Sequence, residues 1–235
     1  MNEFLELCFA AGVFPLGYEI AKDFSVHFQH FLMNRKEKCK KLYDDFDKEK
    51  SNIPTEFLIE PKDSIVLPTL RTAILYVDDD EIRTLFSKLL ASAFDSRKIS
   101  HIHPCFVEII KQLSPFDARI LMNIHDNMDL HGIVATSKNR EYSLVETSML
   151  TDMKSIELID MSISNLKRLG IIHIDSSTTP LYRGEEDECI SMDFPEPLNQ
   201  SSKICKILEN NSLNGYTVNA YITNLGNDFL KTCID

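Results

Sequence analysis

The hydrophobic positions follow helical spacing over much of the first half of the chain. Between Tyr18 and about Lys50, large apolar residues recur at intervals of three or four, which predicts a long amphipathic helix with one buried face. Its other face carries a basic cluster and then an acidic one: Arg35, Lys36, Lys38, Lys40 and Lys41, followed by Asp44, Asp45, Asp47 and Glu49. Such a face is usually solvated surface, and the alternative is that the basic cluster docks a partner protein.

The segment from 54 to 113 predicts a central bundle of short helices. Pro54, Pro61 and Pro68 divide its first part, and because proline removes a backbone donor, helices should stop or restart there. The acidic run 78–81 suits a helix N-terminus, and an apolar stripe follows from Ile82 to Ala93. A further helix is expected to start at His103-Pro104, and Ser114 with Asp117 predicts a capping box for the next one.

After Ser114 the pattern changes to mixed α and β. The predicted order is a helix, the β-prone pieces GIVAT and YSLVE, a helix near 155–169 ended by Gly170, strands at 170–174 and 216–223, and a helix at 228–233. This order is typical of a winged helix. Its wing would be long and acidic, with the sequence GEEDE at Gly184 to Glu188.

The expected fold is therefore mainly α, with a C-terminal α+β part. Three parts are predicted: residues 1–53 with the N-terminal apolar segment and the long amphipathic helix, residues 54–113 with the helical bundle, and residues 114–235 with the winged-helix-like domain. The apolar N-terminus contains Glu3 and Glu6 and is interrupted by Pro15, so it does not fit a signal peptide or a membrane span. It predicts a packed helix followed by a turn, and contact with a membrane surface is the alternative.

Composition narrows the classes of partner. The 235 residues have 43% hydrophobic content and a net charge of -11, which fits a folded protein and disfavours nucleic acid and anionic membranes as partners. The six cysteines show neither zinc spacing nor a compact disulfide framework, which is typical of a cytoplasmic protein with reduced thiols. We expect a protein partner or self-association.

The sequence contains none of the common motifs for nucleophilic catalysis or nucleotide binding. It has no GxSxG, no GxxxxGK[ST] and no GxGxxG, so we predict no catalytic residue, no cofactor and no small-molecule ligand. His101 and His103, with Asp95 and Glu108 nearby, are weak candidates for a metal site, and a metal-dependent nuclease or hydrolase is the corresponding alternative. The structural interpretation places His103 near a helix N-terminus, with its ring bonding the 95–97 turn.

Four polar residues predict a structural motif: Asp95, Arg97, His103 and Ser114. Asp95 and Arg97 could pair with each other or across the turn, and a buried polar network joining helices would require such pairing. An interaction site is the alternative for these residues.

The predicted winged helix raises DNA binding as another possibility. Its third helix would present Asn165, Lys167 and Arg168 to the major groove. Acidic residues at the entry of this helix and in the wing would repel phosphates, which favours docking of a protein instead.

The most specific sequence features lie between Glu60 and Leu121. They are the Glu60-Pro61 entry, Pro68, the DDDE run, LFSKLLASAFDSR from Leu85 and HPCFVEIIKQLSP from His103, with weaker matches in NLKRLGIIHI and AYITNLGNDFLKTCI near the end. This pattern resembles the abortive-infection alpha family of bacterial proteins, whereas residues 1–50 and 176–214 match it poorly. The resemblance implies a role in defence against phage, which we expect to proceed without catalysis, by protein interaction or self-association. A DNA-binding regulator is the main alternative.

Overall fold

The structure, a computed structural model, describes residues 26–127, 130–138, 140–145, 149–182, 206–208 and 210–235. The chain divides into two compact units, Met1–Ala118 with Asp228–Asp235, and Arg119–Asn227. The boundary predicted between residues 113 and 114 lies a few residues before this division. Residues 228–235 join the first unit, because Phe229 and its neighbours pack there.

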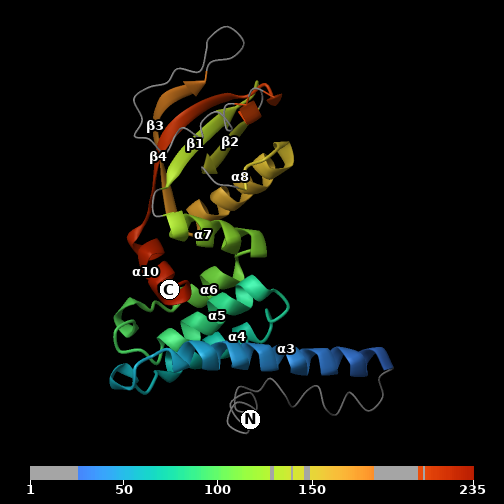
Figure 1. Cartoon of the computed structure of the whole chain (residues 1–235), viewed down its shortest axis with the longest axis vertical. Helices are drawn as coiled ribbons and strands as arrows, with labels where there is room; N and C mark the ends of the chain where they lie inside the picture. Colours follow the sequence, from blue (N-terminus) through green and yellow to red (C-terminus); the bar gives the residue numbers. More distant parts are fainter. Residues whose placement is uncertain (1–25, 128–129, 139, 146–148, 183–205, 209) are drawn as a thin grey trace. The chain divides into compact units, whose positions relative to one another are not determined.

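The first unit is helical (Figure 1). Its elements are α3 (Val26–Ser51), a 3-10 turn at Thr55–Phe57, α4 (Asp63–Ala73), α5 (Asp80–Ser92), a 3-10 turn at Ile99–His101, α6 (Cys105–Lys111), the start of α7 (Pro115–Asn127) and the end of α10 (Asn224–Cys233). Helix α5 is central, because it packs against α3, α4 and α6.

The apolar stripe predicted from Ile82 to Ala93 explains the position of α5. Leu85, Phe86 and Leu89 are completely buried, and the stripe is therefore the core-facing side of the helix, as predicted. The acidic residues Asp80 and Glu81 lie in the first turn, where the partial positive charge of the helix N-terminus favours them.

The prediction that a helix stops or restarts at Pro68 is wrong. Helix α4 runs through Pro68 from Asp63 to Ala73. Pro68 and Ser64 are both exposed, so water can reach the carbonyl of Ser64 that loses its partner, and the missing donor costs less than it would inside the core.

Capping residues define the starts of two further helices. At α7 the amide of Ser114 donates to Asp117 Oδ2 (2.8 Å) and the amide of Asp117 donates to Ser114 Oγ (3.1 Å), so the predicted capping box is present. At α8 (Met153–Arg168) a second capping box joins Asp152 and Ser155. Each cap satisfies amides that the helix itself leaves without partners.

The second unit combines α8 with an antiparallel sheet (Figure 1). The strands are β1 (His131–Thr136), β2 (Glu141–Val145), β3 (Ile172–Tyr182) and β4 (Asn214–Ile222), in the order β2-β1-β4-β3. Helix α8 packs against β2 and β3. Gly170, with φ of +75°, follows the C-cap residue Leu169 and ends α8, as predicted, because this conformation is unfavourable for residues with a Cβ atom.

The chain is thus mainly helical with a small antiparallel sheet, in agreement with the expected fold class. The acidic sequence Gly184 to Glu188 and the N-terminal apolar segment lie outside the described residues. No helix among the described residues has the length and apolar content needed to cross a membrane.

Candidate functional site

Helix α3 presents a charged face to solvent. Seven charged residues on it are exposed, and we call them the α3 surface: Lys36, Glu37, Lys40, Lys41, Asp44, Asp47 and Lys48. Of the predicted interaction cluster, Lys36, Lys40 and Lys41 belong to this surface, Lys38 forms an ion pair with Asp78, and the side chain of Arg35 lies outside the described residues. The structure therefore leaves three of the predicted lysines available on one helix.

The opposite face of α3 is attached to the helical core. Leu42 is completely buried, and the Phe46 ring contacts that of Phe94, with centroids 5.6 Å apart. The ammonium group of Lys50 lies 4.5 Å from the centroid of the Phe94 ring, a cation–π contact. These contacts hold the second half of α3 against the end of α5.

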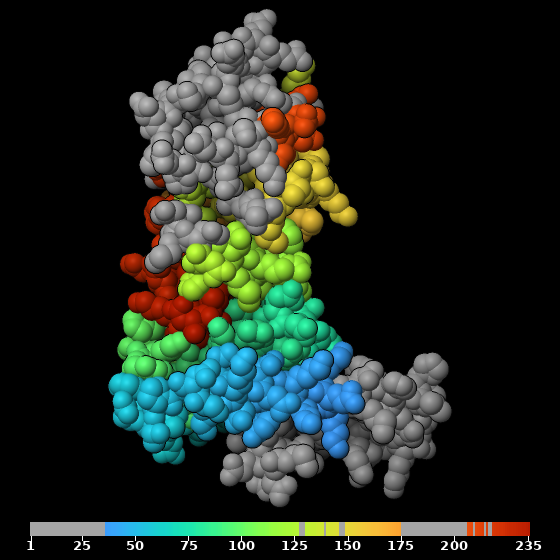
Figure 2. Space-filling view, viewed as in Figure 1, coloured from blue at the N-terminus to red at the C-terminus, as the bar shows by residue number. Residues whose placement is uncertain are grey.

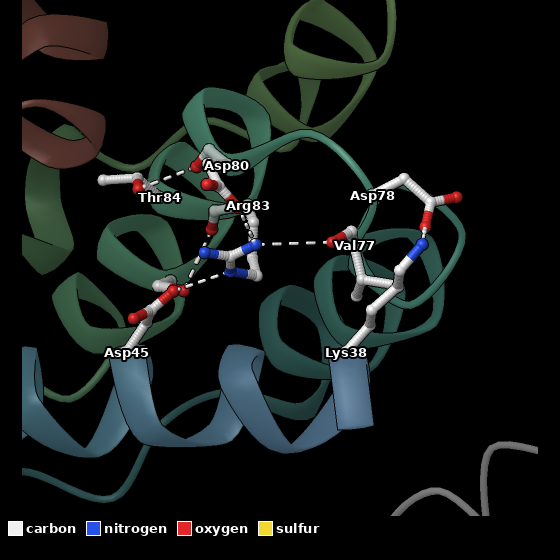
Figure 3. A network of polar contacts seen from close by, with 8 residues as sticks. Lys38, Asp45, Val77, Asp78, Asp80, Arg83 and Thr84 are labelled. Atoms are coloured by element: carbon white, nitrogen blue, oxygen red, sulfur yellow. Dashed lines mark hydrogen bonds and ion pairs between the residues drawn. The ribbon is translucent and has the colours of Figure 1, made fainter. Parts of the chain in front are cut away.

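A polar network around Arg83 joins α3 to α5 (Figure 3). Arg83 Nε donates to Asp45 Oδ2 (2.7 Å), and its Nη1 donates to Asp80 Oδ1 (2.5 Å) and to the carbonyl of Val77 (3.4 Å). The Arg83 side chain is only 10% exposed, so it is a buried cation whose charge is balanced by carboxylates from both helices.

The pKa values in this network follow its geometry. Burial opposes the charge on Arg83, but the hydrogen bonds to Asp45 and Asp80 outweigh it and raise the pKa of Arg83. The hydrogen bond from Arg83 lowers the pKa of Asp80. The network therefore keeps its charged form at neutral pH, which holds α3 in a fixed position on α5.

Asp95 organises the turn after α5. Its side chain is 2% exposed, accepts the amide of Arg97 (2.9 Å) and pairs with the guanidinium of Arg97 at 2.6 to 3.2 Å. The guanidinium also lies 4.5 Å from the centroid of the Phe57 ring. Backbone hydrogen bonds from Ile59 to the carbonyl of Phe94 and from Ser96 to that of Phe57 link the turn to residues 57–59.

Replacing Asp95 with asparagine should lower the free energy of unfolding by about 1–2 kcal/mol at pH 7, because a buried ion pair with Arg97 is lost while Arg97 itself stays half exposed. The hydrogen bond from Arg97 lowers the pKa of Asp95 below its ordinary 3.8, so this contribution is present above about pH 3.8 and is lost as the pH falls through the lower folded pKa. Denaturant unfolding of both proteins between pH 3 and 7 would test this, and an equal difference at all pH values would contradict it.

A small polar cavity lies beside this turn. It has a volume of about 180 Å³ and is lined by the end of α3 (Glu49, Asn52, Ile53), by α5 (Lys88, Ala91, Ser92), by the turn (Asp95, Arg97, Lys98) and by Asp235. Asp95 pairs with Arg97, and Lys88 donates to the carbonyl of Ile234. The cavity is smaller than the roughly 300–1,000 Å³ typical of ligand pockets, so its volume does not suit an ordinary small-molecule ligand.

The two candidate metal ligands have different partners. His101 Nδ1 lies 2.7 Å from Asp228 Oδ1, whereas His103 Nδ1 accepts the amide of Cys105 (3.2 Å). The predicted bond from the His103 ring to the 95–97 turn is therefore wrong, because the ring caps the start of α6 instead. Glu108 pairs with Lys111, and the described residues contain no group of three or more metal-ligating side chains.

The C-terminal segment completes the first unit. Phe229 is buried and its ring meets that of Phe106 edge to face, with centroids 5.4 Å apart. Ser92 Oγ donates to the carbonyl of Thr232 (2.8 Å). Burial raises the pKa of the Cys233 thiol to about 12, so this thiol stays protonated and is a packing group.

The residues proposed for DNA contact lie at the end of α8. Lys167 and Arg168 are exposed, and Asn165 is half-buried with its Oδ1 accepting from Arg168 Nη2 (2.7 Å). Asp152, at the start of α8, is engaged in the capping box. Asp160, in the middle of the helix, accepts the amide of Ser143 through its Oδ1 (2.7 Å). The acidic residues of α8 thus serve partly as structural acceptors.

Two residues of the site were not predicted from the sequence. Arg83 lies next to the apolar stripe of α5, and a charged residue beside buried positions is a signal that it needs a partner. Asp45 and Asp80 supply that partner, and Asp45 is distant in sequence. Lys88, which reaches the carbonyl of Ile234, carries a similar signal within the same helix.

Comparison with known families gives one match. The model of the family described as "Abortive infection alpha" matches residues 29–233, which is most of the chain and includes α3 as well as the C-terminal helix α10. Comparisons with curated proteins and with solved structures gave no significant match. On the family match, this chain belongs to the abortive infection alpha family.

Proposed function

We propose that this protein acts in abortive-infection defence against phage, without catalysis, by associating with another protein or with a second copy of itself. Membership of the abortive infection alpha family supports the role in defence. The observation that supports association is the α3 surface, whose seven exposed side chains form no hydrogen bond or ion pair within the described part of the chain.

The α3 surface is well suited to recognition because its backbone is ordered before any partner arrives. The Arg83 network and the buried Leu42 hold the helix, so binding does not have to pay for folding it. Charged side chains on a rigid helix contribute mainly to specificity and to the rate of association. The cytoplasm is the proposed location, because the scattered spacing of the six cysteines is typical of reduced thiols.

We also propose that residues 119–227 form a winged-helix-like module that docks a protein. The supporting feature is β4, which pairs with both β1 and β3 beside α8. In chain order, the strand β2 lies between β1 and α8, at the position where a helix-turn-helix would have another helix. DNA readers usually place the N-terminal residues of the recognition helix against the bases, whereas Lys167 and Arg168 lie at the C-terminal end of α8.

The proposal is tested by phage plating on bacteria that express the protein. Reversing the charge of Lys36, Lys40 and Lys41 to glutamate should abolish protection, because these side chains are exposed and available to a partner. The matched variant Lys167→Glu with Arg168→Glu should protect as well as the natural protein. Western blotting for equal protein levels and circular dichroism of the purified variants control for loss of folding.

The opposite pattern would support the DNA-binding alternative. If the α8 variant loses protection, and a salt-dependent mobility shift of duplex DNA disappears with it, the protein acts on nucleic acid. Full protection by the α3 variant would contradict the assignment of the α3 surface. Cleavage of nucleic acid by the purified protein with added divalent metal would contradict a function without catalysis.

A further inference from the structure

The charges of α3 form a mirrored pattern with inverted sign. The sequence KEKCKKLYDDFDKE covers residues 36–49, and its centre lies between Leu42 and Tyr43. Each charged residue on one side of this centre has a residue of opposite charge at the same distance on the other side: Lys36 and Glu49, Glu37 and Lys48, Lys38 and Asp47, Lys40 and Asp45, Lys41 and Asp44. The two remaining pairs, Cys39 with Phe46 and Leu42 with Tyr43, are uncharged.

The structure shows which of these residues are available. Lys38 pairs with Asp78, Asp45 accepts from Arg83, and Glu49 lines the cavity beside the turn, so these three serve the fold. Two mirrored pairs keep both members on the α3 surface, namely Glu37 with Lys48 and Lys41 with Asp44. Figure 2 shows the described side chains of α3, in blue, at the surface of the first unit.

The exposed members share one face of the helix. Positions 37, 41, 44 and 48 follow the spacing i, i+4, i+7 and i+11, which places them along one stripe at 3.6 residues per turn. Lys40 and Asp47 flank this stripe and are exposed as well. On either side of its centre the stripe is therefore basic in the N-terminal half, at Lys40 and Lys41, and acidic in the C-terminal half, at Asp44 and Asp47, and Glu37 and Lys48 carry the opposite sign at the two ends.

A stripe with this symmetry is complementary to itself when reversed. If a second copy of α3 lies antiparallel to the first, with a two-fold axis beside residues 42 and 43, Lys41 of each copy faces Asp44 of the other and Glu37 faces Lys48. A parallel arrangement would instead place like charges together. Two-fold interfaces are isologous, so one patch must match itself, and this patch does.

The exposed charges do not neutralise one another within the helix. Glu37 with Lys41, Lys40 with Asp44, and Asp44 with Lys48 are spaced i, i+4 and could have paired. None of these three ion pairs is formed in the described structure. Their charges remain available to a partner.

We propose that two copies of this chain associate through antiparallel pairing of their α3 surfaces. This inference rests on the proposed function and names its partner as a second copy. The contact is short, since 12 residues of helix span about 18 Å, and exposed ion pairs are individually weak. The pairing is therefore reversible and sensitive to salt, and it depends on several charge pairs acting together.

The proposal is tested by reversing the charges of the basic or the acidic residues of the α3 surface. Self-association of each variant is measured by sedimentation velocity over a range of protein concentrations. The basic-block variant is Lys40→Glu with Lys41→Glu, and the acidic-block variant is Asp44→Lys with Asp47→Lys. In about 0.05 M salt, each variant alone should have a dissociation constant at least about tenfold higher than the natural protein. An equimolar mixture of the two variants should associate, and the variant with all four substitutions should recover self-association.

The matched control carries Lys62→Glu with Lys154→Glu, two exposed lysines outside α3 that give the same change in net charge as the basic-block variant. It should associate like the natural protein. Association should also weaken in about 0.5 M salt, where screening is nearly complete. Monomers at all concentrations, equal association of all variants, or failure of the four-substitution variant to recover would each overturn the inference.

The two proposals fail in different ways. If the four-substitution variant associates with itself but does not protect cells, α3 binds a different protein, and the defence function stands without self-pairing. If it recovers both association and protection, self-pairing is the mechanism by which α3 acts. If no variant affects protection, the role proposed for the α3 surface in defence fails, whatever the association in solution.

Discussion

Replacing Phe229 with alanine should lower the free energy of unfolding of the first unit by about 4 kcal/mol, the largest effect expected of any substitution considered. The Phe229 side chain is completely buried, and its ring packs edge to face on that of Phe106. The substitution therefore removes a large apolar surface, leaves a cavity and loses a favourable aromatic contact.

Hydrogen exchange measured by mass spectrometry would locate this loss. Because residues 228–235 belong to the first unit, protection should fall in α5 and α6, and it should change much less in β1 and β2. Lys231→Ala, at an exposed position of the same helix, is the matched control and should change stability by less than about 0.5 kcal/mol. Equal loss of protection in both units would contradict the assignment of the C-terminal segment to the first.

Replacing Arg83 with methionine should lower the free energy of unfolding by about 2–3 kcal/mol and loosen α3. The change leaves the carbonyl of Val77 and the carboxylate of Asp45 without their donor. The value lies below that for a fully buried pair because the side chains of Asp45 and Asp80 are 38% and 77% exposed, so water replaces part of the lost interaction.

A double-mutant cycle with Asp45→Asn would separate the pair from the rest of the network. We expect a coupling of about 1–2 kcal/mol between positions 83 and 45 in urea unfolding, together with faster amide exchange in α3. Thr84→Ser, at the neighbouring position of α5, keeps the hydroxyl that donates to the carbonyl of Asp80 and should be nearly neutral. Additive effects of the two substitutions would show that Arg83 does not join α3 to α5 through Asp45.

Local patterns predicted much of this fold because they act over one or two helical turns. The apolar stripe of α5, the capping box at Ser114 and Asp117, and Gly170 at the end of α8 each depend on residues close in sequence. The mainly helical class followed from the same periodicities. The wrong prediction at Pro68 came from treating proline as a helix break without knowing that its turn faces solvent.

Features that depend on distant residues could not be predicted in this way. Nothing near Arg83 in the sequence identifies Asp45 as its partner, and nothing near Phe106 identifies Phe229. The His103 ring was predicted to bond the 95–97 turn, and it instead accepts the amide of Cys105, which the backbone at the start of α6 places beside it. The charged residues of α3 were visible at once, but their exposure and the use of Lys38 and Asp45 by the fold required the structure.

The return of the chain to the first unit at Asp228 has a consequence for biosynthesis. During translation, residues 1–118 emerge early but lack the segment that carries Phe229, whereas residues 119–227 can all be present before it. The unit that bears α3 should therefore be the last to mature, only after residues 228–235 have left the ribosome. Under the role proposed for the α3 surface, association through this helix would therefore begin only after residues 228–235 have packed into the first unit.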